Sequence, residues 1–153
     1  MCSSDLTPRR IALDLGSSIE TEKRLLEEIN EWRIRSLSLP ALEMDERTQE
    51  LARRYSQDMA QRRFFAHVDP DGRTVEDRLA GAGIGFIAAG ENLAKVEDGP
   101  LIPREVVEEW VRSKSHLKQI QNPFFRMTGI GIWEGEGVHY VTQIFLKPFS
   151  KRP

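Results

Sequence analysis

The chain has 153 residues, of which 39% are hydrophobic and 30% are charged. This length and composition are typical of one ordinary globular domain. The 22 Lys and Arg residues nearly balance the 24 Asp and Glu residues, and the formal net charge of −2 argues against nucleic acid as a partner. No apolar run reaches the ~20 residues that a membrane-spanning helix needs.

The first 18 residues are rich in Ser, Pro and Gly, which disfavours a regular core element. Cys2, the only cysteine, follows Met1 and precedes small polar residues, as the lipid-modified cysteine of a mature bacterial lipoprotein does. We therefore predict a flexible tether over residues 1–18 that follows a lipidated Cys2. This arrangement would anchor the protein at the membrane and place it outside the cytoplasm, at the cell envelope. The alternative is a cytosolic start with a chance cysteine.

Apolar residues at helical spacing, together with capping residues, predict the helices of the chain. Asp45 is the expected N-cap of the second helix. Thr74 and Asp77 form a capping box for the third, just after a type I turn over residues 69–72. Trp110 lies on the apolar stripe of the fourth and should be buried. The expected helices cover residues 19–39, 46–63, 74–79 and 103–112, with a further helical turn that begins at His116.

Three strands are expected, and two of them form a hairpin late in the chain. Residues 84–94 mix β-forming and small residues and predict a short irregular strand. Residues 127–133 and 138–146 alternate as strands joined through Gly135-Glu136-Gly137. Helices combined with late, adjacent strands predict an α+β domain with an antiparallel sheet and argue against a parallel Rossmann sheet.

Several short motifs resemble the CAP superfamily of cysteine-rich secretory, antigen 5 and pathogenesis-related proteins, in its bacterial form. They are Phe65-Ala66-His67 before an Asp-Pro-Asp-Gly turn, Gly90-Glu91-Asn92-Leu93-Ala94, Trp110 followed by Ser113, Ser115 and His116, and Tyr140-Val141-Thr142-Gln143-Ile144-Phe145. Their order extends over most of the chain, so residues 19–153 are identified as a CAP domain. The resemblance implies an α-β-α sandwich with a central antiparallel sheet and a cleft.

The same resemblance implies that two histidines and acidic residues face each other in the cleft and hold a divalent metal. By position, His67 and His116 match the histidines and Glu91 matches the first glutamate. Ser113 stands where many eukaryotic members have a second cleft glutamate. The resemblance thus gives His67, Glu91, His116 and Ser113 as a ligand-binding cleft, with the first three as ligands for zinc or another divalent metal.

The residue types leave more than one function open. Two imidazoles and a carboxylate suit Zn²⁺ with an open position for water, but they can equally form a hydrogen-bonded polar cluster. The favoured hypothesis is a binding module for a metal, lipid or other small cell-envelope ligand. The alternative is a metal-assisted hydrolase of peptide or cell-wall material with Glu91 as base. No nucleophile motif of the Gly-x-Ser-x-Gly type occurs.

Overall fold

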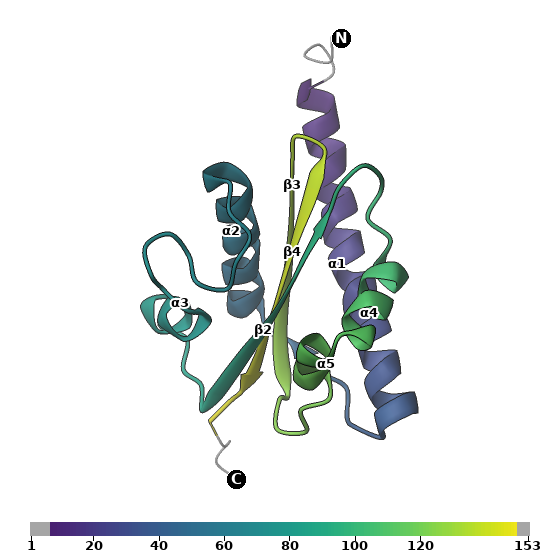
Figure 1. Cartoon of the computed structure of the whole chain (residues 1–153), viewed down its shortest axis with the longest axis vertical. Helices are drawn as coiled ribbons and strands as arrows, with labels where there is room; N and C mark the ends of the chain where they lie inside the picture. The colour runs from purple at the N-terminus through teal and green to yellow at the C-terminus, as the bar shows by residue number, and fades with distance from the viewer. Residues whose placement is uncertain (1–6, 150–153) are drawn as a thin grey trace.

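A four-stranded sheet lies between two layers of helices in the computed structural model, which describes residues 7–149, with side chains from Ser18 onward (Figure 1). Helices α1, α4 and α5 cover one face of the sheet, and α2 and α3 lie on the other. This arrangement confirms the predicted α+β class and the α-β-α sandwich.

The helices begin and end largely where capping residues predicted. Asp45 accepts a hydrogen bond from the Thr48 N–H at the start of α2, and Thr74 and Asp77 form both bonds of a capping box at α3. The expected turn closes through a bond from Gly72 N to Asp69 O. The helices are α1 (Thr7–Leu37), α2 (Glu46–Arg62), α3 (Val75–Gly81), α4 (Pro103–Arg112) and α5 (Lys114–Ile120).

The predicted start of the first helix at Ile19 is wrong, because α1 begins at Thr7. Gly and Ser lower helix propensity by only about 1 kcal/mol per residue or less. Such a cost is tolerated when a long helix is already nucleated, since each added residue then gains a hydrogen bond. Residues 7–18, predicted as part of the tether, belong to α1. Cys2 lies outside the described residues, so lipid anchoring stays a prediction.

The sheet has the order β1-β3-β4-β2, with strands β1 (Glu43–Met44), β2 (Ala88–Val96), β3 (Met127–Gly135) and β4 (Val138–Lys147). Strands β2, β4 and β3 pair antiparallel as predicted, and the short β1 adds a parallel edge. The hairpin turns through Glu136 and Gly137 at φ of 54° and 79°, the sign that a tight two-residue turn requires. The expected irregular strand over 84–94 is instead the regular, later strand β2, which pairs with β4 along its whole length.

Helix α2 packs unusually close to β3 because two glycines remove the side chains between them. A Cβ on Gly129 would lie 2.3 Å from the backbone of Thr48, and one on Gly131 would lie 2.1 Å from that of Arg53. Ser56 of α2 also donates to the carbonyl of Gly131 over 2.9 Å. This contact fixes α2, and with it the loop after α2 that carries His67.

The opposite face of the sheet is closed by α1 and α4 over the largest apolar cluster. Trp110 is 2% exposed, as predicted, and its indole N–H donates to the carbonyl of Leu93 over 3.0 Å. Among the described residues, no helix has the length and apolar character needed to cross a membrane.

Candidate functional site

The centre of the site is a hydrogen bond between His67 and Glu91. His67 lies on the loop between α2 and α3, while Glu91 lies on β2. His67 Nδ1 is 2.8 Å from Glu91 Oε1, and the histidine side chain is 59% exposed whereas the carboxylate is 2% exposed. An ionised carboxylate can only accept, so Nδ1 is the nitrogen that donates, and a neutral ring in this tautomer has its lone pair on Nε2. The His67 ring, which is more exposed than the Glu91 carboxylate, therefore offers Nε2 to a ligand.

Arg78 of α3 holds the other side of the Glu91 carboxylate. Its Nη1 lies 2.8 Å from Glu91 Oε2, and its Nη2 donates to the backbone carbonyl of His67 over 2.7 Å. The guanidinium also lies 3.4 Å from the centre of the Tyr55 ring, and the Tyr55 hydroxyl donates to the carbonyl of Ala66. One buried cation thus fixes both the carboxylate and the loop that carries His67.

His116 is held from the opposite side of the site, at the start of α5. Its Nδ1 lies 2.9 Å from Ser113 Oγ, its ring stacks on Trp110 with 6.3 Å between ring centres, and its carbonyl accepts from the Asn92 side chain. Because Asn92 follows Glu91 on β2, this last bond ties the His116 helix to the strand that carries the carboxylate. Ser113 therefore positions His116 through its hydroxyl, and it brings no carboxylate to the site.

Burial lowers the pKa of His116, and the neighbouring His67 lowers it further, while Glu109 opposes the shift. Removing an imidazole from water disfavours its charged form. A second nearby imidazole adds repulsion when both are protonated. The site therefore favours neutral His116, which is the form that binds metals.

A groove of about 470 Å³ opens next to His116 between β2 and α4. It is lined on one side by Leu93 to Val96 of β2 and on the other by Trp110, Ser113 and His116, with the exposed ring of Phe65 across the opening. His67 and Glu91 do not line this groove. Glu91 lies on the same strand, and Phe65 shares its loop with His67, so the same strand and loop carry both the groove and the site.

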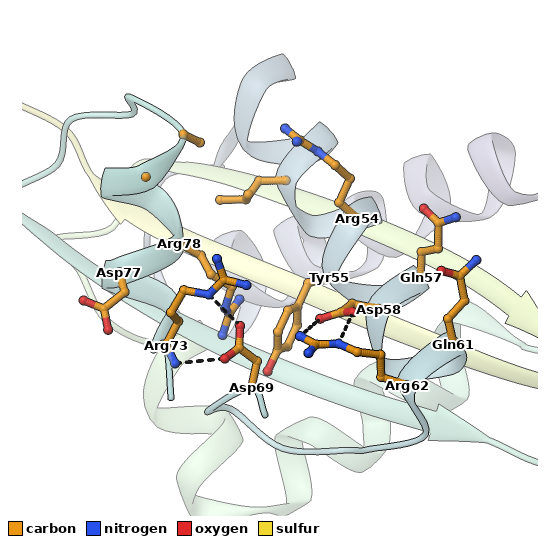
Figure 2. Close-up of a pocket in the computed structure, with 13 residues that line it drawn as sticks. Arg54, Tyr55, Gln57, Asp58, Gln61, Arg62, Asp69, Arg73, Asp77 and Arg78 are labelled. Atoms are coloured by element: carbon orange, nitrogen blue, oxygen red, sulfur yellow. Dashed lines mark hydrogen bonds and ion pairs between the residues drawn. The ribbon is translucent and has the colours of Figure 1, made fainter. Parts of the chain in front are cut away.

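A second pocket of about 580 Å³ lies behind the site, between α2, α3 and the turn at residues 69–72 (Figure 2). Two of its arginines form ion pairs with carboxylates of the same pocket. Arg62 pairs with Asp58, and Arg73 pairs with Asp69, whose carboxylate is almost completely buried. Arg78 lines this pocket too and reaches Glu91 from there. The ion pairs around this pocket therefore stabilise the turn that precedes Arg78.

The donor types at the site are two imidazoles and one buried carboxylate. A carboxylate on the far nitrogen of a metal-binding imidazole is a common way to orient it, and Glu91 has this relation to His67. Both Glu91 oxygens accept hydrogen bonds, and Ser113 brings no charge. Among the described residues, no three His, Cys, Asp or Glu side chains form a group arranged to hold a metal. Whether Glu91 itself ligates stays a prediction.

Of the four predicted cleft residues, the structure joins His67 to Glu91 and Ser113 to His116, with Asn92 as the link between the pairs. Sequence reasoning missed Arg78. Its only signal was its place in the helix just after the Thr74 capping box, where an arginine resembles any solvent-exposed helix residue. It is instead 8% exposed.

These features define a class of protein: an α-β-α sandwich whose sheet edge carries a histidine–carboxylate site beside a groove. Residues 26–145 match the family model described as the cysteine-rich secretory protein family, CAP. The chain belongs to this family.

The chain is similar to proteins of several bacteria. It is 37% identical over 117 residues, or 76% of its length, to the uncharacterized protein YkwD of Bacillus subtilis, and it spans 44% of that protein. An extracellular SCP-domain protein of Bacillus anthracis is 29% identical with a TM-score of 0.74 over 85% of this chain and 41% of that one. An outer surface protein of Borrelia burgdorferi is 25% identical with a TM-score of 0.75, over 84% of this chain and 93% of that one.

Proposed function

We propose that this chain is an extracytoplasmic binding domain in which His67 and His116, supported by Glu91, hold a divalent cation or a small polar ligand. The observation that carries the proposal is the clamp on Glu91, whose two oxygens accept from His67 and Arg78. This clamp fixes the tautomer and the direction of the His67 ring before any ligand arrives, and such preorganisation lowers the cost of binding. The extracellular and outer-surface descriptions of two similar proteins support the location.

Binding is favoured over hydrolysis by the state of Glu91. A general base needs an oxygen that can reach a proton on water or substrate. Glu91 is buried, and each of its oxygens already accepts a hydrogen bond. The carboxylate that raises the pKa of His116 is that of Glu109, which is exposed on α4. The site therefore supplies ligand nitrogens rather than a free base at Glu91, and lipid binding and the Cys2 anchor stay predictions.

Zinc titration by calorimetry on the whole chain at pH 7 tests the proposal. We expect one saturable site of modest affinity, because only two imidazoles are free to ligate. His67→Ala and His116→Ala should each abolish the heat of binding. His139→Ala is the matched control, since the third histidine lies on β4 beside Glu134.

An absence of saturable binding at pH 7, or binding unchanged in both site variants, would overturn the metal proposal. Circular dichroism and thermal melts of each variant separate loss of ligation from loss of fold. A stable, folded His116→Ala chain that no longer binds Zn²⁺ supports ligation by the imidazole.

A further inference from the structure

The free edge of β2 is the feature that the proposed site does not use. In Figure 1, β2 is the front strand of the sheet, with α3 on one side and α4 and α5 on the other. Its position at the end of the order β1-β3-β4-β2 leaves one edge without a neighbouring strand within residues 7–149. An edge strand carries backbone donors and acceptors that can pair with another chain.

The pairing pattern shows which groups of β2 face this edge. The carbonyl of Thr128 accepts from the N–H of Asp45, just after β1, and the N–H of Ile132 donates to Glu22, so the even-numbered residues of β3 point away from β4. In an antiparallel pair, every second residue directs its N–H and carbonyl towards one neighbouring strand, and the residues between direct theirs the other way. With the register of β3 on β4 and of β4 on β2, the even-numbered residues of β2 bond to β4. The carbonyl of the odd-numbered Leu93 accepts from Trp110 outside the sheet, which agrees with this assignment. The backbone groups that face the free edge belong to Ala89, Glu91, Leu93 and Lys95.

Three of these N–H groups are unpaired where the edge passes the histidine site. By this alternation the N–H groups of Glu91, Leu93 and Lys95 point away from β4, and among the described residues no turn, loop or cap carbonyl accepts from them. Glu91 and Leu93 are only 6% and 5% exposed, and buried backbone donors without a partner are rare in native proteins. They repeat every second residue, about 6.6 Å apart along a strand. That is the spacing of the carbonyls on one side of an extended peptide.

We propose that the groove binds an extended polypeptide segment, which pairs with the free edge of β2 as an added strand beside His116. Lys95 supplies both an N–H and a carbonyl, and Leu93 supplies an N–H. The groove alongside Leu93 to Val96 holds the side chains of the segment, and the exposed Phe65 ring forms its apolar wall. A hydrocarbon ligand would leave these amides without a hydrogen-bond partner, which disfavours its binding here. This inference extends the proposed binding site but needs no metal.

One substitution separates the edge from the rest of the fold. Lys95→Pro removes the N–H that faces the free edge and leaves the bonds to β4 intact, because proline is tolerated where the N–H of an edge strand points outward. Lys95→Ala is the matched control, since it removes the same side chain and keeps the N–H. Thermal melts and zinc titration of both variants show that the fold and the histidine site are retained.

The probe is a set of capped hexapeptide pools that together cover all residue types, titrated into the whole ¹⁵N-labelled chain without metal. We expect saturable shifts of the amide signals of Glu91, Leu93 and Lys95 with at least one pool, and at least tenfold weaker binding by Lys95→Pro than by Lys95→Ala. In the peptide identified from that pool, N-methylation should block binding at alternate residues only.

Three results would overturn the inference: no saturable shift with any pool, equal binding by the two Lys95 variants, or N-methyl effects without a period of two. Since peptide binding and zinc binding are measured separately, failure of one does not decide the other.

Discussion

Arg78 and Glu91 form an ion pair with 2.8 Å between Nη1 and Oε2 in which the two side chains are only 6% and 2% exposed. Removing one member of such a pair leaves the other charge buried and uncompensated, and this typically costs ~3–5 kcal/mol. We therefore expect Arg78→Met to lower the free energy of unfolding by about that amount, measured by urea denaturation.

The matched control for this prediction is Arg54→Met on the neighbouring helix, where the arginine is 62% exposed and 3.9 Å from Glu50. Its stability should change by no more than about 0.5 kcal/mol. The double variant Arg78→Met/Glu91→Gln should lose less than the sum of the single variants, because no buried charge remains. An Arg78→Met chain as stable as the control would contradict the buried pair.

The close approach of α2 to β3 gives a second prediction. Gly131→Ala would place a methyl group 2.1 Å from the backbone of Arg53, where no flexible side chain can move aside. Overpacking of this kind costs ~1–3 kcal/mol and sometimes more, and we expect at least the upper value from thermal denaturation. Gly81→Ala at the end of α3, with nothing within 4 Å, should be neutral. Equal melting temperatures for the two variants would show that the helix does not pack this close.

Most of the fold could be predicted from the sequence because its signals are local. Asp45 and the Thr74–Asp77 box mark helix starts through bonds within one turn, and Trp110 lies on a stripe with a helical period. The extension of α1 to Thr7 could not be predicted, since Gly and Ser there resemble a turn-rich segment.

The candidate site depends on contacts that are distant in the sequence. His67 and Glu91 are separated by 24 positions and Arg78 and Glu91 by 13, so no spacing rule relates them. The family resemblance selected the histidines and the glutamate. It gave no reason to choose Arg78, whose role follows only from the path of α3 beside β2.

The lowered pKa of His116 predicts how stability depends on pH. A histidine that is harder to protonate in the folded chain than in the unfolded chain stabilises the fold above its ordinary pKa of about 6.5. This contribution is lost as the pH falls from 6.5 through the lower folded value, because the unfolded state then binds more protons. Urea denaturation between pH 8 and 4 should show this loss in the wild type, and His116→Asn should remove that component. The same pH dependence of the free energy of unfolding in both proteins would contradict this prediction.

Ser113 offers the last test, because by its position it matches the second cleft glutamate of many eukaryotic family members. Its Oγ lies 2.9 Å from His116 Nδ1, so a longer acidic side chain from the same position starts beside the imidazole. Ser113→Glu adds a negative charge near the two histidines, and opposite charges within about 4–6 Å attract strongly in a partly buried site. We expect at least tenfold tighter Zn²⁺ binding by calorimetry at pH 7, about 1.4 kcal/mol. Gln121→Glu, at an exposed position that directly follows α5, is the matched control and should change affinity less than threefold. Equal affinities of the two variants would mean that position 113 does not face the ion.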